Sequence, residues 1–460
     1  MLEVPSIFLS IALLMFFAYK GVSVLVLAPL LASCTVLLSG QESLLAHYTQ
    51  IFMVKLGDFA TIYFPLFLLS AIFGKIMENS GSARAISEYV SQKIGPEKAI
   101  LATVLSCAVL TYGGVSLFVV AFAVYPIAVA LFRKADIPKR LIPPAIALGS
   151  FTFTMVALPG TPAIQNAIPT QYFGTNTFAA PGLGIIAATL MFVGGMFWLR
   201  RQLKFARIIG EGYGQHDDRV LQTAINDLPN FWVAVMPVIL VILVNYISVK
   251  YVFPNIDTSY LQTEKYGATD IKVVAGNWGI IVAVFFSILF LTCKHFKRIN
   301  LLKCLNGGAA DSLLPIFNTA SVVGYGAVIN SLPGFVMIRD QIISLSSENP
   351  IISGSCVTGA LCAITGSASG GLSISMEMIG EQLLKLANQA NVSPEVLHRI
   401  ISLASSTLHA LPHNGAIITL LVICGLTHKD SYRDILVVSL VNTTVATLIA
   451  ILIYNLLGVF

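Results

Sequence analysis

The sequence predicts an all-α polytopic membrane protein, because it is strongly apolar and its apolar residues form long segments. Of the 460 residues, 56% are hydrophobic and only 11% are charged, whereas soluble proteins carry roughly 25% charged residues. The mean hydropathy is +0.83. Many of the segments approach the roughly 20 residues that a helix needs to cross a bilayer. The segments lie at 4–19, 21–39, 59–79, 99–132, 141–175, 181–200, 230–252, 277–294, 307–331, 351–388, 395–426 and 433–458.

A polar stretch of small residues at 365–371 interrupts the apolar segment 351–388. Each arm of this segment is too short to cross a bilayer as a helix. Irregular backbone at membrane depth is tolerated only where it is buried in protein or lines a watery cavity. We therefore expect a re-entrant hairpin whose tip holds a substrate.

Three other segments are interrupted in a similar way, and the interruptions follow the same order in the two halves of the chain. They lie at 111–114 within 99–132, at 159–162 within 141–175, and at 412–415 within 395–426. Each half then contains three ordinary spans, one hairpin, one broken helix and one further span. Paired interrupted segments of this kind are typical of a secondary transporter, and they indicate its binding site.

This order predicts two inverted repeats joined by a cytoplasmic linker at 201–229. The first repeat, 1–200, contains scaffold helices at 4–79, a hairpin at 99–132, a broken helix at 141–175 and a helix at 181–200. The second repeat, 230–460, contains scaffold helices at 230–331, a hairpin at 351–388, a broken helix at 395–426 and a helix at 433–458.

The positive charges favour this layout. If both hairpins return to the side from which they enter, all the Lys and Arg clusters fall on one face, which the positive-inside rule makes cytoplasmic. We therefore expect ten crossings, both termini outside, and a location in the cell inner (cytoplasmic) membrane. The clusters are Lys20; Arg84, Lys93 and Lys98; Arg133, Lys134, Lys139 and Arg140; Arg200, Arg201, Lys204 and Arg207; Lys294, Lys297, Arg298 and Lys303; and Lys429 and Arg433.

The four interruptions are the predicted substrate site. A half-helix that begins inside the membrane offers unpaired N–H groups and a partial positive charge, which suit an anion such as a carboxylate. The interruptions contain no Arg or Lys, so the backbone would do most of the binding. The alternative is that small residues merely allow close helix packing. The predicted substrate-binding residues are Gly113, Gly114, Ser116, Gly160, Thr161, Ser367, Ser369, Gly370, Gly371, His413 and Asn414.

Three ionisable residues are candidates for proton coupling: His413, His409 and Glu377. An intramembrane histidine is a functional hypothesis by default, and an imidazole exchanges its proton near neutral pH. Either histidine could instead bond a backbone carbonyl freed at the break, and Glu377 could belong to an ion pair or a water-facing surface. His398 and Arg399 are expected near the outer surface as solvated residues.

The sequence leaves several alternative interpretations. His409 and His413 have the spacing of a zinc pair, but Pro412 lies between them without a carboxylate, so no metal is expected. No cofactor and no nucleic-acid partner are expected. Carbonyls and hydroxyls at the hairpin tips could coordinate Na⁺, which makes sodium coupling the main alternative. An intramembrane hydrolase using Ser367 or Ser369 with a histidine, and a channel, are the more remote alternatives.

The motifs 370–377 (GGLSISME), 411–415 (LPHNG) and 158–162 (LPGTP) resemble those of the gluconate:proton symporter (gluconate permease) family, within the ion-transporter superfamily. The resemblance covers essentially the whole chain. It implies proton-coupled uptake of a small hydroxy-carboxylate, a homodimer, and elevator movement of a domain carrying both hairpins. The first break contains no His, unlike gluconate-type members. The chain is therefore closer to members associated with short hydroxy acids such as 3-hydroxybutyrate than to those for gluconate itself.

Overall fold

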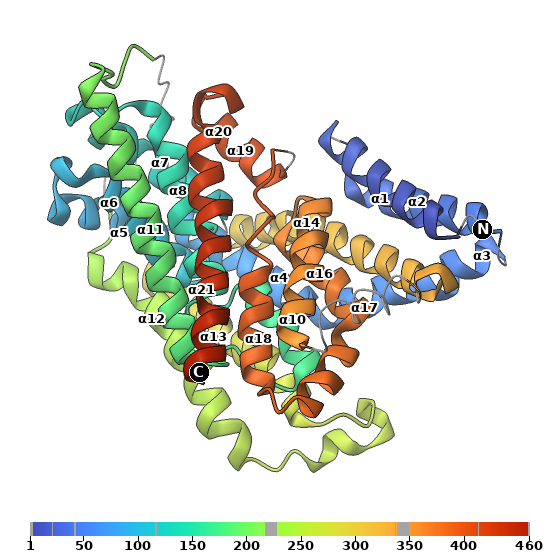
Figure 1. Cartoon of the computed structure of the whole chain (residues 1–460). Coiled ribbons are helices and arrows are strands. Elements are labelled where there is room, and N and C mark those ends of the chain that lie inside the picture. The colour runs from blue at the N-terminus through green and yellow to red at the C-terminus, as the bar shows by residue number, and fades with distance from the viewer. Residues whose placement is uncertain are drawn as a thin grey trace.

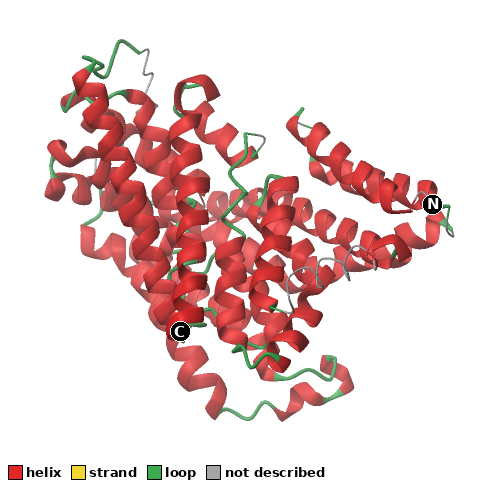
Figure 2. Cartoon of the chain, in the orientation of Figure 1, coloured by secondary structure: helices red, strands yellow, loops and turns green. Residues whose placement is uncertain are grey.

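The computed structural model is built from helices joined by short connections (Figure 2), and the described residues contain no strand. The predicted all-α class is therefore confirmed. The structure describes residues 3–20, 22–40, 43–115, 117–216, 228–335, 337, 349–412 and 414–458.

The first helices form an extended arm at one end of the molecule (Figure 1). α1 (Glu3–Tyr19) packs against α2 (Val24–Ser39), and a continuous helix from Leu44 to Asn79 follows. Its parts are α3 (Leu44–Ala46), the π-helical η1 (His47–Phe52) and α4 (Met53–Asn79). The sequence predicts this span only from residue 59. The apolar segment starts only at residue 59 because Lys55 and Asp58 are charged. Both residues nevertheless lie on the helix, beside a polar cavity, and do not belong to a loop.

The helix α5 (Ser82–Ile94) has no counterpart in the predicted order of segments. It buries Ala83, Ala85 and Ile86 on one face and carries charged residues elsewhere, so its apolar stripe is discontinuous in sequence. A search for uninterrupted apolar segments therefore misses it.

The helices α12 (Phe231–Ile247), α13 (Ile271–His295) and α14 (Leu301–Ser331) open the second half. α14 and α4 run side by side through the centre of the molecule (Figure 1). Glycines permit this close approach: a Cβ at Gly308 would lie 2.6 Å from the Ile72 Cα atom. Tyr325 on α14 also shares a hydrogen bond of 2.9 Å with Ser10 on α1.

Each predicted hairpin consists of two helices joined by a tight turn. The first contains α6 (Ala99–Tyr112) and α7 (Leu117–Lys134), and the second contains α16 (Pro350–Thr365) and α17 (Ala368–Gln389). Gly114 at φ +86° and Gly366 at φ +59° occupy left-handed conformations in the two turns, which favour glycine. The hydroxyl of Ser367 then caps α17 by accepting a 3.1 Å hydrogen bond from the Gly370 N–H. Re-entry from one side of the membrane stays a prediction.

Both predicted broken helices are interrupted, over longer stretches than the sequence indicates. The first consists of α8 (Ile142–Ser150), α9 (Phe153–Val156) and α10 (Ile164–Phe173), and the second of α18 (Pro394–Ala404) and α19 (Gly415–Ile423). The described connecting residues 157–163, 405–412 and 414 are not α-helical. Both halves end in a long helix: α11 (Pro181–Ile208) packs on the continuous helix of α20 (His428–Leu436), η8 (Val437–Val441) and α21 (Asn442–Leu457) (Figure 1).

Six of the described helices are long and apolar enough to cross a membrane. They span Leu44–Asn79, Pro181–Ile208, Phe231–Asn255, Ile271–His295, Leu301–Ser331 and His428–Leu457. α1 and α2 are a little shorter, with 17 and 16 residues. Ten crossings remain a prediction, in which α1, α2 and the two broken helices supply the rest. Of the predicted linker, α11 covers the part up to Ile208, and 217–227 lie outside the described residues.

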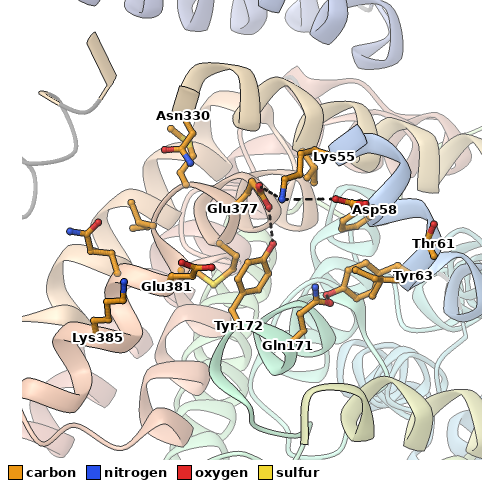
Figure 3. A pocket seen from close by; sticks show the side chains of 18 residues that line it. Lys55, Asp58, Thr61, Tyr63, Gln171, Tyr172, Asn330, Glu377, Glu381 and Lys385 are labelled. Carbon is orange, nitrogen blue, oxygen red and sulfur yellow. Dashed lines mark hydrogen bonds and ion pairs between the residues drawn. The ribbon is translucent and has the colours of Figure 1, made fainter. Parts of the chain in front are cut away.

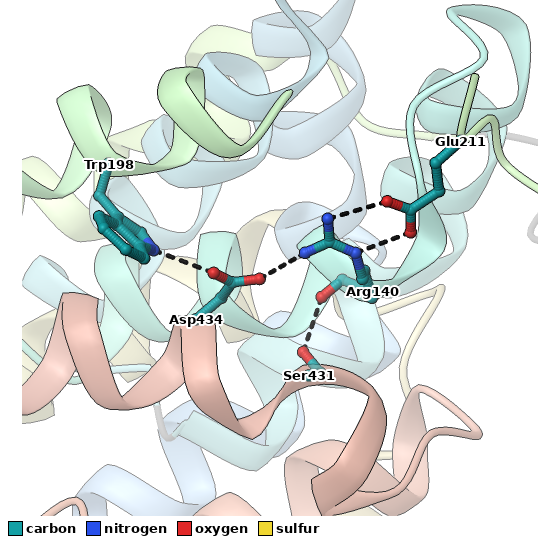
Figure 4. Close-up of polar contacts among 5 residues, drawn as sticks. All are labelled: Arg140, Trp198, Glu211, Ser431 and Asp434. Carbon is teal, nitrogen blue, oxygen red and sulfur yellow. Dashed lines mark hydrogen bonds and ion pairs between the residues drawn. The ribbon is translucent and has the colours of Figure 1, made fainter. Parts of the chain in front are cut away.

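A charged network ties the two halves together at one end of the bundle (Figure 4). Arg140, just before α8, donates two hydrogen bonds of 2.7 and 2.9 Å to Glu211 and a third of 2.7 Å to Asp434 on α20. The Trp198 indole N–H on α11 donates to the other oxygen of Asp434 at 3.0 Å. The Asp434 side chain is only 5% exposed, so losing its partner would leave a buried carboxylate uncompensated.

Arg140→Gln should therefore lower the unfolding free energy by about 2 kcal/mol, since hydrogen bonds to charged groups each contribute roughly 1.5–3 kcal/mol. Thermal unfolding of the purified protein measures the loss. Adding Asp434→Asn to this variant should recover part of it, because the uncompensated charge is removed. Arg207→Gln, at an exposed position on α11, is the control. An unchanged melting temperature in Arg140→Gln would contradict the role of the network.

The predicted topology has its own test in cysteine labelling, performed on a variant without the native cysteines. A membrane-impermeant thiol reagent applied to intact cells should label Gln389→Cys, at the end of α17, and should leave Lys134→Cys, at the end of α7, unmodified until the cells are permeabilised. Both positions are exposed. The reverse pattern at either position would be incompatible with two hairpins that enter from opposite sides.

Candidate functional site

The tip of the first hairpin lies on the first break. The Tyr112 hydroxyl donates a 2.6 Å hydrogen bond to the Pro159 carbonyl, and the Thr111 hydroxyl donates to the Ser150 hydroxyl at 3.0 Å. A Cβ at Gly114 would lie 2.9 Å from the Pro162 ring. Three residues of the hairpin, Thr111, Tyr112 and Gly114, thus hold the broken helix of the same half.

Asparagine side chains satisfy the carbonyls that the first break leaves without helical partners. Asn166 on α10 donates to the Thr161 and Thr177 carbonyls at 3.0 and 2.9 Å. Asn245 on α12 donates to the Gly160 carbonyl at 3.4 Å. Gly160 itself has φ +78° and lies so close to the Phe178 ring that a Cβ would overlap it. Backbone geometry, packing and hydrogen bonds therefore fix the conformation of Gly160 and Thr161 without any ligand.

The sequence expectation for Arg399 is wrong. Arg399 on α18 is fully buried, and its guanidinium reaches from the second half of the chain into the first. It donates to the carbonyls of Val156, Thr177 and Ala179 and to the Asn166 side-chain oxygen, at 2.8–3.2 Å. These contacts occupy all five of its N–H donors. No carboxylate of a described residue forms an ion pair with it.

His398 is also fully buried rather than solvated. Its Nδ1 lies 2.6 Å from the Thr175 hydroxyl and its Nε2 lies 3.3 Å from the Asn166 side-chain oxygen. Sequence alone misplaces both residues because they lie near the start of an apolar segment, where charged residues usually meet water. A cation therefore does lie at the first break, delivered from another helix and not from the break itself.

Side chains satisfy the second break in the same manner. The Asn414 amide donates to the His409 carbonyl at 2.9 Å, and its oxygen caps α19 by accepting from the N–H groups of Ala416 and Ile417. The Tyr432 hydroxyl donates to the Ala410 carbonyl at 3.0 Å. The Pro412 carbonyl lies 3.0 Å from Nε2 of His428.

His409 links the two broken helices. Its ring packs edge-on against Phe151, between α8 and α9 of the first broken helix, with 6.5 Å between the ring centroids. Its Nδ1 lies 2.9 Å from the Ser406 carbonyl, so it carries the hydrogen in the neutral ring, and Nε2 is left as an acceptor. Nε2 is buried and has no hydrogen-bond partner among the described residues.

The tip of the second hairpin packs mainly on scaffold and on its own arms. A Cβ at Gly370 would contact Val322 on α14 at 3.6 Å, and Gly371 lets α17 approach the backbone of Cys362 on α16. The Ser367 and Ser369 hydroxyls lie 3.4 Å apart. The hydrogen bonds described for this tip stay within the hairpin, whereas the first hairpin bonds directly to a break. Of the predicted site, Ser116 and His413 lie outside the described residues.

Glu377 lines a cavity of about 490 Å³ between α4, α10, α14 and α17 (Figure 3). Its carboxylate forms a 3.1 Å ion pair with Lys55 on α4 and accepts a hydrogen bond of 3.3 Å from the Tyr172 hydroxyl on α10. The ion pair was one of the alternatives for Glu377 in the sequence. Lys55 escapes the sequence analysis because it precedes the apolar segment at 59–79, although a lone Lys in a long helical pattern is a signal for function.

Within the described parts of the chain, no three His, Cys, Asp or Glu side chains are arranged to hold a metal ion. The polar groups of the site are hydroxyls, amides, imidazoles, the Arg399 guanidinium and one ion pair. Such groups can bind and release a small polar solute and a proton.

The model of the GntP family permeases matches residues 2–457. The chain belongs to this family. The family expected from the sequence motifs is therefore confirmed. The permease is 43% identical over 472 residues to an uncharacterized transporter of Bacillus subtilis (strain 168), YxjC, with 99% of this chain and 100% of that protein covered. It is 29% identical over 177 residues to an uncharacterized transporter of Haemophilus influenzae, with 38% and 40% of the two chains covered.

The solved structure of the Alcanivorax borkumensis YdaH transporter superposes on the permease with a TM-score of 0.49 at 14% identity, covering 89% of each chain. From the family, the permease is a multi-pass membrane transporter and not an enzyme. The hydrolase alternative with Ser367 or Ser369 is thereby set aside.

Arg399→Leu should destabilise the permease strongly, because it leaves the carbonyls of Val156 and Ala179 buried without a donor. Each orphaned carbonyl costs about 1–3 kcal/mol, giving a loss of roughly 2–6 kcal/mol. Thermal unfolding in detergent measures this loss. Arg399→Lys keeps the charge and three donors, so its stability should lie between those of the wild type and Arg399→Leu. Arg433→Leu, exposed on α20, is the control, and equal melting temperatures in the two leucine variants would contradict the assignment.

Proposed function

We propose that the permease is a secondary active transporter that takes up a small organic hydroxy-carboxylate together with protons, by alternating access. The observation that carries this proposal is the meeting of two broken helices and a hairpin tip in one polar region that is largely buried. Breaks in membrane helices are tolerated where they line a binding site. The substrate-binding residues proposed from the sequence belong to these breaks and to the hairpin tips.

The packing of the two halves supports the proposed inverted repeats. The second arm of each hairpin packs on the last part of the other half's broken helix: α7 on α19, and α17 on α10. Likewise α4 packs on α13, and α14 packs on α2. Such reciprocal pairs are expected when two similar units are related by a two-fold axis. Elevator movement, a homodimer, an inner-membrane location and outside termini belong to the same proposal.

Proton coupling is favoured over the sodium alternative by the state of the break carbonyls. A Na⁺ site in a transporter is usually built from carbonyls of unwound helix. Here the carbonyls of Pro159, Thr161, Ala410 and Pro412 already face side-chain hydrogen-bond partners. The proposed proton carriers are Glu377, His409 and His413.

Uptake into proteoliposomes tests this proposal. Labelled gluconate, 3-hydroxybutyrate, lactate and citrate are offered separately, with either an imposed pH gradient or an imposed Na⁺ gradient. We expect one hydroxy acid to accumulate when the outside is acidic, and a protonophore to abolish the accumulation. Accumulation driven only by Na⁺ would refute proton coupling, and no uptake of any of the four acids would refute the proposed substrate class.

A further inference from the structure

The cavity around Glu377 is separate from the hairpin tip. Glu377 lies ten residues after Ser367 along α17, which is about 15 Å at 1.5 Å per residue. The volume of the cavity, about 490 Å³, lies within the roughly 300–1,000 Å³ that small-molecule sites occupy. The cavity is therefore large enough for a small organic acid of its own.

The charges in this cavity come from two of the four elements around it (Figure 3). α4 supplies Lys55 and Asp58, and α17 supplies Glu377, Glu381 and Lys385. The other titratable groups are the hydroxyls of Tyr63 on α4 and Tyr172 on α10, and α14 contributes the neutral Asn330 and Val323. Three carboxylates against two ammonium groups give the cavity one net negative charge, which opposes the entry of an anion.

Lys55 is the one cation here that is held by an ion pair, with Glu377 at 3.1 Å and with Asp58 at the longer distance of 4.0 Å. The Lys55 side chain is 42% exposed and that of Glu377 is 14% exposed. The ammonium therefore already faces the space that a ligand would fill, while its carboxylate partner lies deeper against Tyr172.

We propose that Lys55 and Glu377 form a coupled site, apart from the residues proposed at the breaks and hairpin tips, in which a proton and the substrate carboxylate first bind together; this rests on the proposed function. Glu377 takes up a proton from the aqueous phase, where H3O+ becomes water, and its carboxyl group becomes neutral. Its ion pair with Lys55 is then lost. The Lys55 ammonium then pairs with the carboxylate of the incoming substrate. The amide groups of Gln171 on α10 and Asn330 on α14 also line the cavity and can bond substrate hydroxyls.

One proton and one monovalent carboxylate entering together leave the net charge of the cavity unchanged, whereas the anion alone would double its negative charge. Binding of each partner must therefore favour binding of the other, and the coupling is reciprocal. Typical couplings of this kind change affinity by about 5- to 150-fold. Proton-first binding at this site would be the physical basis of symport.

The first experiment compares Glu377→Gln with Glu381→Gln, a matched change one turn away in the same cavity. In proteoliposomes, acid outside should stimulate uptake of the transported acid by about tenfold in the wild type and in Glu381→Gln. Glu377→Gln should lose this stimulation but keep exchange of labelled for unlabelled substrate, which needs no net proton movement. Retained acid stimulation in Glu377→Gln, or its equal loss in Glu381→Gln, would overturn the proposal.

Proton uptake on binding provides a second readout. Titration calorimetry of the wild type with the transported acid, in two buffers of different ionisation enthalpy, should show about one proton taken up per substrate at neutral pH. Glu377→Gln should take up none. If the wild type transports the acid in proteoliposomes but binds no proton in calorimetry, the coupled site is refuted and the transport function still stands.

Lys55→Met should raise the substrate KM by about tenfold, with Lys385→Met as the control. A merely structural bridge between α4 and α17 would be restored by the charge-exchanged pair Lys55→Glu with Glu377→Lys. In the coupled site, the exchanged pair should stay without acid-stimulated uptake, and its recovery would overturn the proposal. If Glu377→Gln does not fold, Glu377→Asp should keep the acid stimulation, and its loss there would also overturn it.

Discussion

Where a helix stops inside an apolar protein, its freed carbonyls must find donors, and this constraint organises the permease. Two helices stop in this way, and the side chains that meet the need come both from nearby residues and from other helices. Tyr112, Asn166 and Asn245 serve the first break, and Asn414 and Tyr432 serve the second. An unmet carbonyl at this depth would cost about 1–3 kcal/mol. Irregular backbone therefore survives only because neighbouring helices are built around it.

Arg399 extends the same logic between the halves. Four of its five N–H donors hold carbonyls that end α9 and precede α11, while the residue itself belongs to α18. A buried cation without a carboxylate partner is expensive, so carbonyl dipoles must offset its charge. Hydrogen bonds thus hold the two broken helices together as one body. The Arg140 network joins α8 to α20 in a similar way at one end of that body.

The cavity at Glu377 lies at the edge of this body, where α4 and α14 meet α10 and α17. The Lys55 side chain of its ion pair is partly exposed, unlike the buried Arg399 at the breaks. A rigid core and an adaptable polar edge are suited to different tasks: the core preserves geometry, and the edge can exchange partners. The ion pair between Lys55 on α4 and Glu377 on α17 joins a scaffold helix to the second hairpin through charge.

The sequence by itself determined the helical membrane class, the family, the four interruptions and the candidates His409 and Glu377, because hydropathy and small-residue motifs are local properties of the chain. It could not place Arg399, His398 or Lys55, and it missed α5. Their roles depend on which carbonyl or carboxylate lies across from them, at sequence separations of more than 200 residues for Arg399. Only the tertiary structure decides such pairings, because burial and hydrogen-bond partners arise when distant segments pack together.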